Sequence, residues 1–128
     1  MSLRSPLGRV LGLGSAKDGS SHWYMQRISA VALVLLGLWF VASLASLPGA
    51  GHAAVTGWLR SPVNSVLAVL LVAVAAYHAN LGLQVVVEDY VASKGGRMAV
   101  LVAIKFALVV AALVGVLAVL RIAFGVEA

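Results

Sequence analysis

The sequence contains no cysteine. This absence excludes disulfides, thiolate-bound zinc, iron–sulfur clusters and a cysteine nucleophile, because each of them needs a Cys sulfur. Any redox cofactor that this chain holds must therefore be bound through histidine or be supplied by a partner protein.

Charged residues are also scarce. Asp, Glu, Lys and Arg make up 10% of the chain and hydrophobic residues 62%, whereas typical soluble domains have about 25% and about 45–50%. So little charge cannot cover a soluble surface, and the surface must therefore face lipid. The net charge of +5 comes from basic residues at the ends of apolar runs. It does not form a basic stripe with interleaved aromatics, which argues against nucleic-acid binding.

Three apolar runs are long enough to cross a membrane. No charged residue interrupts residues 28–47 or 63–87, and only Lys105 interrupts residues 98–120. A helix of about 20 apolar residues spans the hydrocarbon core and satisfies its own backbone polar groups. The sequence therefore predicts an all-α membrane protein with three transmembrane helices.

The segments between the runs contain residues that end or begin helices. Pro and Gly follow the first run at residues 48–51, Ser61-Pro62 combines an N-cap with a first-turn proline, and residues 93–97 form a short polar turn. A cleaved signal peptide is the alternative for the first run, but the run and the leader before it are long for one. The predicted organisation is a cytoplasmic N-terminal arm and a three-helix transmembrane domain: residues 1–27, and residues 28–128 with helices at about 28–47, 62–90 and 97–122.

Basic residues are distributed unevenly between the two ends of the predicted helices. Those before the first helix or between the second and third are Arg4, Arg9, Lys17, Arg27, Lys94 and Arg97. Only Arg60 and Arg121 fall at the opposite ends. The positive-inside rule then predicts a cytoplasmic N-terminus and a C-terminus on the outer side of the membrane.

The second predicted helix carries His78 within the membrane span. An ionisable residue there is costly and indicates a function by default. A neutral imidazole can be an axial haem ligand, and Gly82 one turn later would let a flat group approach; alternatively, the His hydrogen-bonds across a helix interface. Asp89 follows after 89 − 78 = 11 residues, which places it on nearly the same helix face, roughly 16 Å along the axis.

Asp89 and Tyr90 lie at the predicted cytoplasmic end of this helix. Tyrosines are common there as interfacial anchors. The functional alternative is a phenol that donates a hydrogen bond to a quinone carbonyl, with the carboxylate tuning a nearby cation. Arg27, at the entry of the first span, suits a buried anion such as a haem propionate or serves as a positive-inside charge, and the same alternatives apply to His22.

Two segments of the chain resemble the smaller membrane-anchor subunit of succinate dehydrogenase, respiratory Complex II, of the alphaproteobacterial and mitochondrial-like kind. They are residues 14–27, with His22 and Arg27, and residues 78–90, which begin with His78 and end in Asp-Tyr. The order of the three helices and the total length also agree, so the resemblance covers nearly the whole chain.

The resemblance implies roles for individual residues. His78 would be one axial ligand of a b-type haem, with its iron also bound by the larger anchor subunit. Tyr90 would hydrogen-bond ubiquinone beside Asp89. Arg27 would contact a haem propionate, and His22 is a candidate for the same contact. No catalytic residue is assigned to this chain.

The resemblance also implies partners and a location. A larger cytochrome b anchor, an iron–sulfur subunit and a flavoprotein would complete the complex in a bacterial inner membrane, with the FAD and the iron–sulfur clusters held only by partners. The complex would oxidise succinate and reduce quinone, and the chain would not be catalytic alone. The alternatives are a fumarate reductase anchor, a proton-coupled transporter or channel subunit in which His78 and Asp89 form a proton relay, and a cofactor-free structural or assembly protein.

Overall fold

The computed structural model describes residues 17–126, and within that range it contains four helices and no strand. The helices are α2 (Lys17–Ser46), α3 (His52–Leu59), α4 (Pro62–Tyr90) and α5 (Lys94–Ala123). Three of them, α2, α4 and α5, are long and apolar enough to cross a membrane. The prediction of an all-α membrane protein with three spans is therefore confirmed.

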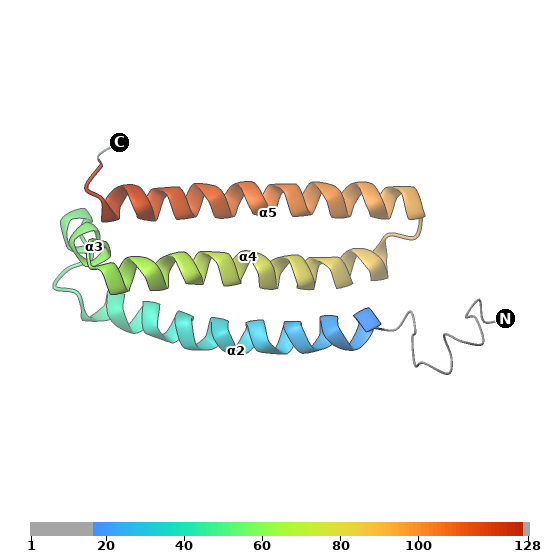
Figure 1. Ribbon diagram of the computed structural model, residues 1–128, viewed down its shortest axis with the longest axis horizontal. Helices are drawn as coiled ribbons and strands as arrows, with labels where there is room; N and C mark the ends of the chain where they lie inside the picture. Colours follow the sequence, from blue (N-terminus) through green and yellow to red (C-terminus); the bar gives the residue numbers. More distant parts are fainter. Residues whose placement is uncertain (1–16, 127–128) are drawn as a thin grey trace.

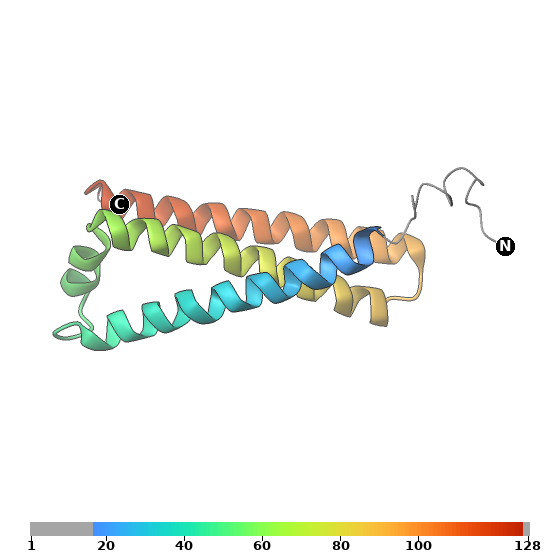
Figure 2. The ribbon, with the colours of Figure 1, turned by 60° about the horizontal axis from the view of Figure 1, so that its bottom comes forward.

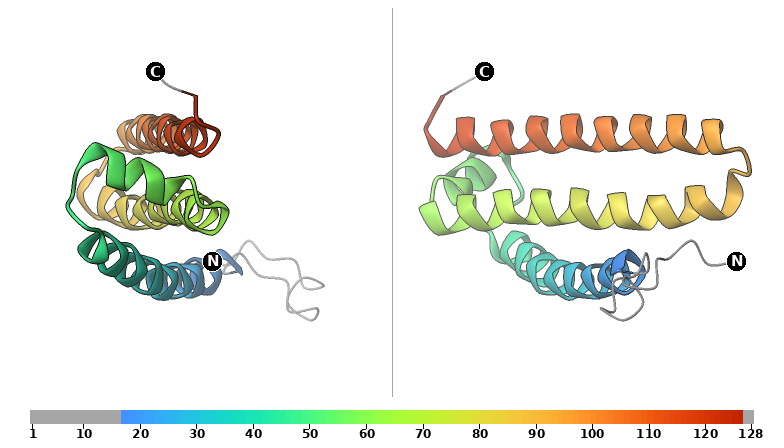
Figure 3. Two further views of the ribbon diagram at one scale, coloured as in Figure 1. Left: turned by 90° about the vertical axis from the view of Figure 1, so that its left-hand side faces the viewer. Right: turned by 45° about the vertical axis from the view of Figure 1, so that its right-hand side comes forward.

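The three long helices lie side by side with α4 in the middle (Figure 1). Helix α5 follows α4 along its length, whereas α2 crosses α4 and diverges from it toward the end where α3 lies (Figure 2). The short α3 lies across that end of the layer (Figure 3). Helix α4 therefore makes two different interfaces, one with α5 and one with α2.

Two helices begin earlier than the hydropathy pattern predicts. Helix α2 starts at Lys17 rather than near residue 28, so part of the expected N-terminal arm is helical. Residues 1–16 of that arm lie outside the described residues. The Ser and Gly residues of 17–27 do not interrupt the helix, although they lower the hydropathy that sets the predicted start.

The turn from α4 to α5 is held by side chains. The Ser93 hydroxyl accepts a hydrogen bond from the Gly96 amide at 3.2 Å, which caps α5 and starts it at Lys94 rather than near residue 97. A Cβ at Gly96 would lie 2.5 Å from the Ser93 oxygen, so any larger residue there would force that hydroxyl to shift. Arg97 donates two hydrogen bonds, at 3.2 and 3.0 Å, to the Val91 carbonyl just after α4. The two helices are thus fixed as antiparallel neighbours.

Helix α3 was not predicted and closes the opposite end. Its Trp58 ring packs against Trp39 and Phe40 of α2, with ring centroids 5.3 and 6.0 Å apart. The Asn64 amide of α4 donates to the Trp58 carbonyl at 3.0 Å. This aromatic cluster joins α2 to α4 where the two helices are furthest apart.

Few side chains are buried in the described part of the chain. Those that are buried belong to α2, α3 and α4: Ser29, Leu59, Ser65, Ala68, Leu81 and Val87. Helix α5 has none, although it approaches α4 closely where Gly115 faces Val72. The outer faces of all three long helices are apolar and exposed, as expected of surfaces that face lipid or another membrane subunit.

Candidate functional site

His78 lies in the α2–α4 interface and is half-buried. Its Nδ1 lies 2.8 Å from the Ser29 hydroxyl of α2. That hydroxyl also donates to the Gln26 carbonyl, at 3.1 Å. The bond across a helix interface that the sequence left open as an alternative is therefore present, and it occupies one ring nitrogen.

The other ring nitrogen of His78 is open. Nε2 makes no hydrogen bond within residues 17–126, and it is not one of the buried unpaired atoms of that part of the chain. It is therefore accessible from outside the helix pair. A neutral imidazole with one nitrogen hydrogen-bonded and the other free is suited to ligate a metal. Hydrogen bonding across the interface and metal ligation are thus compatible in this residue.

Further ligands for a metal at His78 do not come from nearby side chains of the described residues. Among residues 17–126, no three His, Asp or Glu side chains form a group that could hold a metal ion. A metal bound at Nε2 would therefore take ligands from outside the side chains of residues 17–126.

Gly82 has one close neighbour from another helix. A Cβ added there would meet Nε2 of the Gln26 side chain at 3.7 Å, which is an ordinary contact distance. The space that the sequence suggested for a flat group is therefore approached by a side chain of α2.

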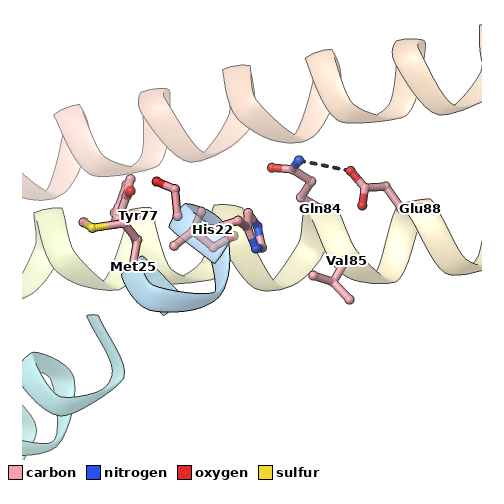
Figure 4. A pocket seen from close by; sticks show the side chains of 8 residues that line it. His22, Met25, Tyr77, Gln84, Val85 and Glu88 are labelled. Atoms are coloured by element: carbon pink, nitrogen blue, oxygen red, sulfur yellow. Dashed lines mark hydrogen bonds between the residues drawn. The ribbon is translucent and has the colours of Figure 1, made fainter. Parts of the chain in front are cut away.

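His22 lies near a polar pocket between α2 and α4 (Figure 4). The pocket has a volume of about 450 Å³, and its polar lining is Ser21, His22, Tyr77, Gln84 and Glu88. The Gln84 amide donates to the Glu88 carboxylate at 3.0 Å on one side of α4. Polar side chains of α2 and α4 thus lie together along the part of α4 that runs from Tyr77 to Glu88 and includes His78.

Two side-chain atoms near this pocket are buried without hydrogen-bond partners. They are Nε2 of His22 and Oε1 of Gln26, which lie one turn apart on α2. A buried unpaired polar atom costs about 1–3 kcal/mol and calls for an explanation. These atoms are available to a polar group from outside residues 17–126.

Arg27 is placed differently from His22. Its guanidinium lies 5.5 Å from the centroid of the Trp23 ring, on an exposed face of α2. It does not line the pocket that contains His22. The structure therefore does not bring the two expected propionate contacts into one cavity.

Asp89 and Tyr90 are the last two residues of α4. Both are exposed, Tyr90 to 84% of its surface. Asp89 makes no hydrogen bond or ion pair with any residue in the described range. The two groups are free to contact a molecule at this end of the bundle, about three turns of α4 from His78.

The basic residues are segregated between the two ends of the bundle. Arg97 lies in the first turn of α5, at the end of the bundle where α2 begins. Arg60 and Arg121 lie at the other end, where both border a cavity of about 790 Å³ between α3 and α5. The sequence assigned Arg60 and Arg121 to one side of the membrane, and the fold places them at one end.

Ser29 is the residue of this site that sequence reasoning missed. It is only 4% exposed and is one of two buried polar residues of the described chain, the other being Ser65. The available signal was a hydroxyl at the start of an apolar run. Serine is common in membrane helices as packing or as a local backbone bond, so that signal alone could not have singled it out.

Comparison with known proteins gives one family. The family model described as succinate dehydrogenase/fumarate reductase transmembrane subunit matches residues 1–115. The chain is 35% identical over 102 residues to a succinate dehydrogenase hydrophobic membrane anchor subunit of Rickettsia bellii, covering 80% of this chain and 82% of that protein.

Two further relatives carry the same description. The anchor subunit of Rickettsia felis is 32% identical over 88 residues, covering 69% of this chain and 73% of the relative. That of Paracoccus denitrificans is 28% identical over 102 residues, covering 80% and 79%. The residues matched by the family model include the whole of α2 and α4.

Proposed function

Because this chain belongs to the succinate dehydrogenase/fumarate reductase transmembrane subunit family, we propose that it provides an axial ligand of haem b and part of a ubiquinone site. Its general role follows from the family: it is a hydrophobic membrane-anchor subunit of the succinate dehydrogenase type and part of an oxidoreductase complex. The complex passes electrons from succinate to quinone, and this chain is not catalytic alone.

The observation that carries the haem proposal is the state of the His78 ring. Nδ1 is satisfied by Ser29 at 2.8 Å, and Nε2 is accessible without a partner in the described range. Haem bound at Nε2 would supply a one-electron redox centre. This chain contributes the imidazole, holds its orientation and surrounds it with the apolar faces of α2 and α4.

A second anchor subunit completes the site. This chain offers one histidine in the span, and α5 has no buried residue among those described. A larger cytochrome b anchor would cover apolar faces and provide the second axial ligand. The FAD and the iron–sulfur clusters belong to the flavoprotein and iron–sulfur partners, since this chain lacks cysteine.

We assign ubiquinone contact to the end of α4. The exposed phenol of Tyr90 can donate a hydrogen bond to a quinone carbonyl oxygen. Asp89, which has no ion-pair partner in residues 17–126, can balance a cation supplied by a partner subunit. Both groups lie where a headgroup can enter from the membrane surface.

Haem propionates are the proposed partners of His22 and Arg27. The buried unpaired Nε2 of His22 supports this role, because it lacks a hydrogen-bond partner among residues 17–126. Arg27 carries the charge that suits a carboxylate, although its present contact is the Trp23 ring. These residues lie at the end of the bundle that we place at the cytoplasmic surface of a bacterial inner membrane, with the C-terminus periplasmic.

The test is a reduced-minus-oxidised visible spectrum of the complex purified in mild detergent, for wild type, His78→Ala and His52→Ala. We expect a b-type haem signal in wild type that is lost or shifted in His78→Ala. His52 is the matched control, because it is an exposed histidine at the start of α3 and does not lie in the α2–α4 interface that contains His78. An assembled wild-type complex without haem would remove the role of His78 and favour a cofactor-free anchor or a transporter.

A fumarate reductase anchor is the second candidate, since the family description covers both enzymes. The two differ in the direction of the reaction, which depends on the potential of the quinone and on the flavoprotein. Comparing succinate oxidation with fumarate reduction by the same purified complex distinguishes them. A higher rate of fumarate reduction with the quinol of the host membrane would favour this second candidate.

A further inference from the structure

We propose that Ser29 is a positioning residue for His78: its hydroxyl accepts a hydrogen bond from Nδ1–H of the imidazole, which keeps the proton on Nδ1 and leaves the lone pair on Nε2 for the haem iron. This inference rests on the proposed function, because it takes His78 to be a ligand. It adds a residue of α2, which the family resemblance did not indicate, to the haem-binding part of the chain.

The direction of the two hydrogen bonds follows from the number of protons. A serine hydroxyl has one proton and can also accept. The Gln26 carbonyl only accepts, and we assign the Ser29 proton to the 3.1 Å bond to that oxygen. With that assignment, the 2.8 Å contact with His78 is a bond that Nδ1–H donates to the Ser29 oxygen. In a neutral ring this assignment puts the lone pair on Nε2.

The arrangement also fixes the orientation of the ring. Ser29 is 4% exposed, and its hydroxyl is held by the backbone of its own helix. Rotation of the His78 ring would break the bond and leave a buried hydroxyl lone pair without its donor. Donation from Nδ1 also increases the electron density at Nε2 and makes it a better ligand.

The competing explanation is that Ser29 and His78 only join α2 to α4. Such an interhelical bond would affect stability and assembly. It would not change the electronic properties of a haem in a complex that assembles normally. The haem midpoint potential and the rate of haem loss therefore separate the two explanations.

The experiment uses the whole complex, purified with wild-type chain or with Ser29→Ala, Ser29→Thr, Ser29→Cys, Ser65→Ala or His78→Ala. Ser65 is the matched control: it is also a buried serine that donates to a backbone carbonyl three residues earlier, at 3.0 Å, but it has no hydrogen bond to a histidine of the described residues. Haem content, midpoint potential and haem transfer to apomyoglobin are measured for each. Potential and transfer report on the ligand without enzyme turnover.

We expect Ser29→Ala to lose haem about 10-fold faster or more, the range typical of lost outer-shell partners. Its midpoint potential should move to a more positive value, because a weaker imidazole donor stabilises the oxidised iron less. Ser29→Thr keeps the hydroxyl and should restore both properties, and Ser65→Ala should match wild type. If Ser29→Ala does not assemble, Ser29→Cys carries the test, since it keeps the side-chain volume but accepts the proton poorly.

The outcomes separate this inference from the proposed function. If Ser29→Ala or Ser29→Cys loses haem at the wild-type rate and has the wild-type midpoint potential, while His78→Ala loses or shifts the haem signal, the role of Ser29 is overturned. His78 then remains the ligand. A His78→Ala spectrum equal to wild type would overturn the ligand assignment itself, and the role of Ser29 with it.

Discussion

The two interfaces of α4 are built in different ways. Toward α5, the helices approach at small residues, and a Cβ at Gly115 would lie only 3.2 Å from the Val72 side chain. Toward α2, the contact contains the Ser29–His78 bond and the unpaired buried atoms of His22 and Gln26. Close apolar packing stabilises membrane helix pairs, whereas unpaired polar atoms destabilise them.

Under the proposed function, this difference gives α4 a structural side and a functional side. Evolution can keep an unfavourable arrangement of polar groups where another molecule satisfies them. The α4–α5 pair therefore acts as the rigid support, and the α2–α4 pair presents the histidine. Three substitutions test this division, beginning with the one of largest expected effect.

Gly115→Leu should disrupt the supporting interface. The added side chain has no room against Val72, and overpacking of this kind costs about 1–3 kcal/mol. SDS-induced unfolding in detergent micelles measures the loss. Adding Val72→Ala should recover part of it, because the two sites are coupled.

Gly37→Leu is the control for this substitution. Gly37 is a glycine of α2 with no atom within 4 Å of an added Cβ. A Gly115→Leu protein as stable as Gly37→Leu would show that the α4–α5 contact is not closely packed. The division into a supporting and a functional side would then fail.

Ser93→Ala should have the next largest effect, at the turn that joins the supporting helices. It removes the oxygen that accepts the Gly96 amide, and loss of an N-cap costs about 1 kcal/mol. Hydrogen exchange at the first turn of α5 should become faster. Ser61→Ala is the comparison, because Ser61 precedes α4 without a side-chain cap bond; equal effects of the two substitutions would contradict the capping role.

Gly82→Ala should have the smallest effect, although it lies on the functional side. The new methyl group would be in ordinary contact with Gln26, and alanine favours a helix over glycine by about 0.5–1 kcal/mol. We expect unchanged haem content in the visible spectrum and stability equal to wild type or slightly higher. Loss of haem in an assembled complex would show instead that a flat group lies against Gly82.

Much of the membrane architecture could be predicted from hydropathy. The three apolar runs become α2, α4 and α5 because a span of lipid-facing residues can satisfy its backbone only as a helix. The helical start at Lys17 and the short α3 could not be predicted in this way. The first lies in a polar segment, and the second forms by packing Trp58 on aromatic residues of α2.

The site divides in the same manner. The sequence alone determined that a lone histidine lies within a span of α4 and that Asp-Tyr ends this helix, because both facts are local to one segment. Only the tertiary structure decided that Ser29 forms a hydrogen bond with Nδ1 of His78 and that the Gln26 side chain approaches Gly82. These contacts depend on the rotation and crossing of α2 against α4. Hydropathy carries no record of that geometry, since apolar helices can pack against one another in many registers.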